Sequence, residues 1–168
     1  MTVALAALLA ALSQAPSSPG AKPAATPAAQ AEGPTIPKAP DADALLAQAV
    51  QLQEAGDLFG AVSNYEAYLK TNPDNAGARS NLGAAYVRLG RLPEGIAEYR
   101  KALALDPASP TYRFNLALAL YKGANYQEAV TELQSTIAAA PRHLGARLLL
   151  GDCYLRQGRF QDVVDLLA

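Results

Sequence analysis

Side chains that could perform covalent or metal chemistry are few and isolated in this sequence. His143 is the single histidine and Cys153 the single cysteine among 168 residues. One of each leaves no internal disulfide and argues against a histidine-based triad or a cluster of metal ligands. No nucleophile stands beside a base, and no phosphate-binding loop occurs. We therefore expect no catalytic, cofactor or metal site and predict that the chain is not an enzyme. His143 is expected to cap a helix and Cys153 to fill space in the core.

Two rows of polar side chains recur every 34 residues and could bind a peptide. Asn81 and Asn115 each offer two donors and an acceptor to the backbone of an extended segment. Arg88, Lys122 and Arg156 form a basic row, which would favour an acidic segment. The basic row has a structural alternative, because basic residues in the last turn of a helix complement its dipole.

The elements that carry these rows follow the same period, which Pro73, Pro107 and Pro141 mark. A fixed period of this length indicates a repeat architecture. Apolar residues at helical spacing predict four helix pairs, and no single pair could bury its apolar face alone. The expected fold class is therefore all-α, a solenoid of stacked antiparallel helix pairs. The pairs are expected at residues 42–55 with 58–71, 76–89 with 92–105, 110–122 with 126–139, and 144–157 with 160–168.

Capping residues mark both ends of the leading helix, the first helix of each pair. Residues 41, 75, 109 and 143 precede the four leading helices, and three of them are good N-caps. Gly56, Gly90 and Gly158 follow three of these helices, where a left-handed conformation ends a helix cheaply. Ala124 occupies the corresponding position after the third. We expect Gly123 to take that role one residue early.

Two further periodic sets concern packing. Gly83 and Gly151 lie in the middle of leading helices, which predicts that another helix backbone crosses closely at each. Arg79, Arg113 and Arg147 begin successive leading helices. They are expected to lay their aliphatic stems over neighbouring helices and keep the guanidinium group in water.

The charge balance and the first 40 residues limit the class of partner. With 14 basic and 15 acidic residues, the chain has no electrostatic case for nucleic acid or a membrane surface. The apolar run at residues 3–12 is shorter than the roughly 20 residues that cross a bilayer, so no stable membrane span is expected. The run fits a signal peptide at residues 1–15, which would make the protein secreted or periplasmic. The alternatives are an alanine-rich tail or a misassigned start, and then a cytoplasmic location. Residues 16–40 are rich in proline and alanine and are expected to be a disordered linker.

This layout resembles the tetratricopeptide repeat (TPR) family, a 34-residue helix–turn–helix repeat. The resemblance covers residues 41–168, with repeats at about 42–75, 76–109 and 110–143 and an incomplete fourth at 144–168. The family's tryptophan in the first helix is absent. The second repeat matches best, at Leu82, Gly83, Tyr86, Gly90, Tyr99, Ala102 and Pro107.

The resemblance implies a concave groove, lined by the leading helices, that binds a peptide or helix of a partner protein. The chaperone-binding branch of the family holds a terminal carboxylate with Lys, Asn and Arg residues, of which only Asn81 is present here. Asparagine is also simply common at that family position, so both interpretations of the asparagines stay open. The expected groove residues are Leu46, Val50, Asn81, Ala84, Val87, Arg88, Phe114, Asn115, Leu118, Tyr121, Lys122, Leu148, Asp152, Leu155 and Arg156.

Three hypotheses for function follow. The first is a non-enzymatic scaffold for protein–protein interaction, in the bacterial envelope if the signal peptide is real. The second is a docking arm of a larger enzyme or envelope assembly protein whose other domains lie beyond residue 168. Solenoids normally finish with a polar capping helix, whereas Val163, Val164, Leu166 and Leu167 lie in the last one here. We therefore expect a fragment of a longer protein, and the third hypothesis is self-association through this uncapped helix.

Overall fold

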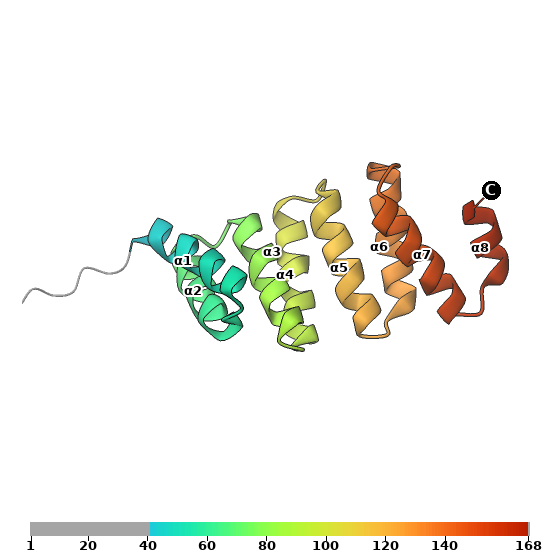
Figure 1. Ribbon diagram of the computed structural model, residues 1–168. Coiled ribbons are helices and arrows are strands. Elements are labelled where there is room, and N and C mark those ends of the chain that lie inside the picture. Colours follow the sequence, from blue (N-terminus) through green and yellow to red (C-terminus); the bar gives the residue numbers. More distant parts are fainter. Residues whose placement is uncertain (1–40, 168) are drawn as a thin grey trace, which may run out of the picture. The chain divides into compact units, whose positions relative to one another are not determined.

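The computed structural model describes residues 41–167, so the expected signal peptide and linker lie outside the described residues. Within this part of the chain the structure is all α-helix, without a strand (Figure 1). The helices are α1 (Ala42–Ala55), α2 (Leu58–Thr71), α3 (Ala76–Arg88), α4 (Leu92–Leu105), α5 (Pro110–Lys122), α6 (Tyr126–Ala139), α7 (Leu144–Arg156) and α8 (Phe160–Leu167). These bounds agree with the predicted ranges to within one residue, and the predicted fold class is confirmed. No helix among residues 41–167 has the length and apolar character needed to span a membrane.

The leading helices α1, α3, α5 and α7 begin at side chains that accept a hydrogen bond from the first turn. Oδ1 of Asn75 accepts from the backbone N–H of Ala78 at 2.9 Å. Nδ1 of His143 accepts in the same way from Ala146 at 3.0 Å, so the expected role of His143 as a cap is confirmed. Asp41 and Ser109 cap α1 and α5 by the same means. Each cap satisfies a donor that the helix itself leaves unpaired.

The turns that end the leading helices keep strictly to the repeat period. Gly56, Gly90 and Gly158 have φ angles of +88°, +78° and +70°, as predicted. The prediction for the third turn is wrong, because Gly123 has φ −83° and Ala124 has φ +57°. The N–H of Ala124 donates to a carbonyl in the last turn of α5, as the N–H of Gly90 does in α3. This shared bonding fixes the left-handed site in register, and there Ala124 carries a strain of roughly 1–2 kcal/mol.

Helix pairs stack in chain order, as Figure 1 shows. Each leading helix packs on its own trailing helix and on the trailing helix of the pair before it. Leading helices also contact one another, α1 with α3, α3 with α5 and α5 with α7. The trailing helices α2, α4, α6 and α8 make no such contacts among the described residues. Since the leading helices lie closer together, the stack curves toward the surface they share, which we call the leading face.

The core consists of side chains that recur with the period and interlock between neighbouring pairs. Leu82, Leu116 and Leu150 are at most 3% exposed, and each contributes roughly 1.5–3 kcal/mol by its burial. Cys153 is fully buried, and burial raises the pKa of its thiol to about 11. A thiol in that state is protonated and inert, which confirms its expected role as a small core residue.

The close helix crossing that mid-helix glycines predict occurs in only one of the two places. A Cβ on Gly83 would lie 3.1 Å from the carbonyl oxygen of Gly95, and one on Gly95 would lie 2.9 Å from the carbonyl oxygen of Gly83. α3 and α4 therefore cross backbone to backbone. At Gly151 the prediction is wrong, because the nearest atom, Cδ2 of Leu166, is at an ordinary 3.7 Å. Val163 stands in α8 where Gly95 stands in α4, and its side chain holds α8 away from α7.

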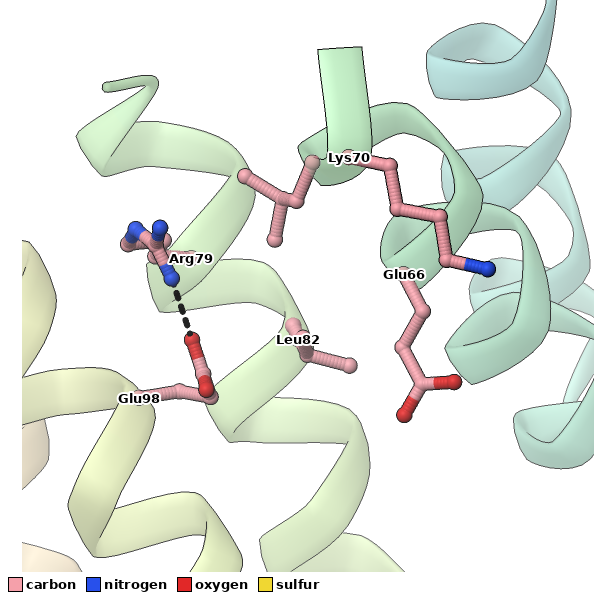
Figure 2. A pocket seen from close by; sticks show the side chains of 6 residues that line it. Glu66, Lys70, Arg79, Leu82 and Glu98 are labelled. Carbon is pink, nitrogen blue, oxygen red and sulfur yellow. Dashed lines mark hydrogen bonds and ion pairs between the residues drawn. The ribbon is translucent and has the colours of Figure 1, made fainter. Parts of the chain in front are cut away.

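The arginines that begin α3 and α5 are ion-paired rather than free in water, which corrects the prediction for both. Arg79 Nη1 lies 3.0 Å from Glu98 Oε2 of α4 (Figure 2), and Arg113 Nη1 lies 2.9 Å from Glu132 Oε2 of α6. Both also donate to the carbonyl of the proline that ends the preceding repeat. Their side chains are only 17% and 26% exposed. Each pair therefore fastens a leading helix to its own trailing helix.

Arg147, which begins α7, differs from these two. The position in α8 that corresponds to Glu98 and Glu132 is Leu166, so an acidic partner is missing there. Arg147 is exposed, as predicted. The last pair thus lacks both the close crossing and the ion pair that fasten the second pair.

Candidate functional site

All fifteen residues predicted to line the groove lie on the leading helices, and none of them is buried. Two hollows on the leading face collect most of them. The first hollow lies between α1 and α3 and has a volume of about 240 Å³. The second lies between α5 and α7 and has a volume of about 410 Å³. Residues at corresponding places in the two hollows are 68 residues apart, which is two periods.

The first hollow is polar and partly closed by its own contacts. Arg88 donates from Nη1 to the carbonyl of Gln53 in the last turn of α1 at 3.0 Å. Val50 and Glu54 of α1 and Asn81 of α3 complete the walls. One arginine of the basic row thus binds a helix terminus, which is the structural alternative described for that row.

The floor of the first hollow combines a buried phenol with an unpaired amide oxygen. Tyr65 of α2 is 1% exposed, and burial raises its pKa, with Asn81 offsetting part of this rise through a hydrogen bond. Oε1 of Gln53 is buried and accepts no hydrogen bond from any of residues 41–167. An unpaired buried acceptor costs free energy until a donor reaches it.

The second hollow is apolar and open. Phe114 and Leu118 of α5 face Leu148 and Leu149 of α7, and Leu148 is 67% exposed. Leu118 stands where Val50 stands in the first hollow, and Leu149 stands where Asn81 stands. The same backbone arrangement therefore presents aliphatic carbon in the second hollow where it presents an amide in the first. An aliphatic side chain that entered the second hollow would be removed from water on several sides.

Gly145 also lines the second hollow, and the sequence reasoning missed it. A Cβ at this position would lie 3.3 Å from Cζ of Phe114, so a side chain would press on that ring. The other face of the ring region meets His143, whose ring centroid is 4.5 Å from that of Phe114. The available signal was positional, because Gly77 is the corresponding residue in the first hollow.

A hydrogen-bonded cluster forms the rim of the second hollow. The hydroxyl of Tyr121 donates to Oδ2 of Asp152, and Arg156 reaches the same carboxylate with Nε at 3.5 Å. The hydrogen bond to Asp152 and then burial raise the pKa of Tyr121, so the phenol stays neutral at physiological pH. This cluster joins α5 to α7 and fixes the width of the hollow.

The two polar rows differ in how much they leave free. Nδ2 of Asn115 lies 3.4 Å from Oγ of Ser80, a contact between α5 and α3. Asn81 is exposed on α3. In the basic row, Arg88 and Arg156 have the contacts described above, and Lys122 is exposed at the end of α5. Peptide binding by either row stays a prediction.

A third hollow, of about 280 Å³, lies away from the leading face (Figure 2). Leu69 and Leu82 form its floor, and Glu66, Lys70 and the Arg79–Glu98 ion pair surround it. Its charged groups are of both signs and balance one another. Within residues 41–167 no group of three or more potential metal ligands occurs.

Comparison with protein families identifies the repeat. Models described as "TPR repeat" and "Tetratricopeptide repeat" match residues 43–75, 85–123 and 114–164. The chain belongs to the tetratricopeptide repeat family. This TPR protein matches no curated protein sequence.

Solved TPR structures share the fold. The first TPR of Spaghetti (RPAP3), bound to the HSP90 peptide SRMEEVD, is 18% identical with a TM-score of 0.67, over 70% of this chain and 93% of that one. A MamA protein is 25% identical with a TM-score of 0.71, over 74% of this chain and 68% of that one. An O-GlcNAc transferase mutant of Thermobaculum terrenum is 26% identical with a TM-score of 0.61, over 67% of this chain but 22% of the enzyme.

Proposed function

We propose that the leading face binds a peptide segment of a partner protein and that the second hollow holds an apolar side chain of that segment. The protein then acts as a scaffold for protein–protein interaction. The observation that carries the proposal is the apolar hollow lined by Phe114, Leu118, Leu148 and Leu149. Ligand sites in proteins combine an apolar lining with a few placed polar groups, and here Asp152 and Tyr121 supply such groups at the rim.

The polar end of the face would hold the backbone of the same segment. Oε1 of Gln53 needs a donor, and a peptide N–H is one. Asn81 offers both a donor and an acceptor beside it. These two amides lie on α1 and α3, whereas the apolar hollow lies between α5 and α7. The bound segment therefore runs along the leading face across the repeats.

An acidic residue in the segment would complement the basic row. Lys122 and Arg156 lie near the end of the second hollow, and Glu54 occupies the corresponding place beside the first. The preferred segment has a large apolar residue with an acidic neighbour. It is not a terminal-carboxylate ligand, because Leu46, Val50 and Thr111 replace the polar residues that the chaperone-binding branch uses. We expect SRMEEVD to bind no better than a scrambled peptide of the same composition.

The test is selection from a random peptide library displayed against the whole chain, followed by anisotropy measurements with a selected peptide. We expect the selected sequences to share Leu, Ile, Phe or Met. Leu118→Asp should weaken binding by about tenfold or more, because a carboxylate in the hollow repels an apolar side chain.

The matched control is Val50→Asp, the same change at the corresponding position of the first hollow. It should alter the affinity by about twofold at most. Circular dichroism would verify that both variants fold. Equal losses in both variants, or no loss with Leu118→Asp, would count against the second hollow as the binding site.

A docking arm of a larger enzyme is the second candidate function. The match to 22% of the Thermobaculum terrenum enzyme supports it, because a TPR stretch of this size is a part of that chain. The parent reading frame separates the candidates, since a catalytic domain after residue 168 would favour the docking arm. Export is proposed on the apolar run alone. A fusion of residues 1–40 to a reporter that is active only outside the cytoplasm would test it.

A further inference from the structure

Exposed large apolar side chains gather at one end of the stack. Among the described residues eight such side chains are exposed, and six of them belong to the last helix pair. Their exposure ranges from 50% to 81%. A concentration of this kind marks an interaction surface rather than scattered surface residues. We call this surface the end face, and it consists of Leu144, Leu148 and Leu155 of α7 with Phe160, Val164 and Leu167 of α8.

The same positions are covered in the preceding repeat. Tyr126, Val130 and Leu133 of α6 correspond to the three end-face residues of α8. Tyr126 is half-buried, and Val130 and Leu133 are 3% and 0% exposed. α7 packs against α6 and against α5, so one leading helix covers the counterparts of both parts of the end face. The end face is therefore a surface of the kind that a leading helix covers.

Three helices of the chain show what such a helix must carry. Each presents a leucine, a small residue three positions later, and a tyrosine or leucine one position after that. These are Leu82, Ala85 and Tyr86 in α3; Leu116, Ala119 and Leu120 in α5; and Leu150, Cys153 and Tyr154 in α7. All nine side chains are buried at 7% exposure or less.

We propose that the end face docks an amphipathic helix of a different protein that carries this pattern, leucine followed by a small residue at the third position and tyrosine or leucine at the fourth. The docked helix would contact α7 and α8 as α7 contacts α5 and α6. This surface is separate from the second hollow, although Leu148 borders both.

A second copy of this chain does not supply the helix. In the described residues, every helix with the pattern is already packed inside the stack. The free leading helix at the other end, α1, has Gln48 and Gln51 at the leucine and small positions, and both are exposed. This polar surface also prevents copies from stacking head to tail into filaments.

The experiment uses two labelled synthetic peptides and the whole chain. Residues 75–90 carry the pattern of α3, and residues 41–56 carry the polar counterpart of α1. The 75–90 peptide should bind, and the 41–56 peptide should bind about tenfold more weakly or not at all. Val164→Asp should weaken binding of the 75–90 peptide by about tenfold, because it places a charge at the centre of the covered surface.

The control variant is Phe59→Asp, which changes an equally exposed apolar residue of α2, far along the chain. It should leave binding unchanged. No binding of the 75–90 peptide, equal binding of both peptides, or an equal loss with Phe59→Asp would overturn the proposal. So would a dimer, seen by sedimentation, that Val164→Asp dissociates, because a second copy would then occupy the end face.

Discussion

The two hollows of the leading face have the same framework and opposite chemistry. α1 and α3 form the first as α5 and α7 form the second, with corresponding residues 68 positions apart. Val50, Gln53 and Asn81 become Leu118, Tyr121 and Leu149. The first hollow binds part of its own chain through Arg88, and the second is open and apolar. A repeat fold thus fixes where side chains lie, and the residues at the recurring positions decide what each place can bind.

The largest expected effect comes from exchanging the chemistry of the two hollows at one position. Leu149→Asn gives the second hollow the amide that Asn81 supplies in the first. A peptide selected on the wild-type chain should bind about tenfold more weakly, because its apolar side chain would then desolvate a polar group. Fluorescence anisotropy measures the change.

Asn81→Leu is the reciprocal variant and should leave the affinity for that peptide within about threefold. A tenfold loss with Asn81→Leu and none with Leu149→Asn would reverse the assignment of the two hollows.

The walls of the two hollows also differ in how they are fastened. Arg79 ties α3, a wall of the first hollow, to Glu98, whereas Arg147 begins α7 without an acidic partner. Arg79→Ala should lower the free energy of unfolding by about 1 kcal/mol, because it leaves a largely buried carboxylate with fewer donors. Arg147→Ala should lower it by less than about 0.5 kcal/mol. Urea denaturation gives both values, and equal effects would contradict the difference between the walls.

The turns after α1 and α5 form a third matched pair. Gly56 and Ala124 are 68 residues apart, and both have positive φ angles. Ala124→Gly should stabilise the chain by about 0.5–1 kcal/mol, because it relieves strain at the cost of some backbone entropy. Gly56→Ala should destabilise it by a similar amount. Thermal unfolding would show opposite shifts in Tm, and shifts of the same sign would disprove the strain at Ala124.

The smallest effect concerns charge. Lys122 beside the second hollow corresponds to Glu54 beside the first. Lys122→Ala should weaken binding of an acidic selected peptide by about twofold and reduce its salt dependence, because an exposed charge contributes little. Glu54→Ala should not weaken binding. Affinities that do not change with salt in the wild-type chain would remove the basic row from the account.

Features fixed within one helix or turn could be predicted from the sequence. The helix bounds, the cap at His143 and the left-handed glycines depend on neighbours a few residues away and on a clear period. The period itself was more reliable than residue type, since Ala124 adopts the left-handed conformation in preference to Gly123.

Features that depend on two helices were predicted less well. The pairing of Arg79 with Glu98 joins residues 19 apart, and only the shared recurrence at Arg113 and Glu132 could have indicated it. The wide crossing at Gly151 is set by Val163 on another helix. The leading helices and their outward residues followed from the period, but the depth of the second hollow depends on Gly145 and the ring of Phe114.

The most direct test of the central claim is methyl NMR of the chain during titration with a peptide selected from a random library. We predict that the methyl signals of Leu118, Leu148 and Leu149 shift together as the apolar side chain enters the second hollow, while those of Val50 change little. Shifts confined to Val50, or to Val164 and Leu167 of α8, would contradict the claim that the second hollow holds the peptide.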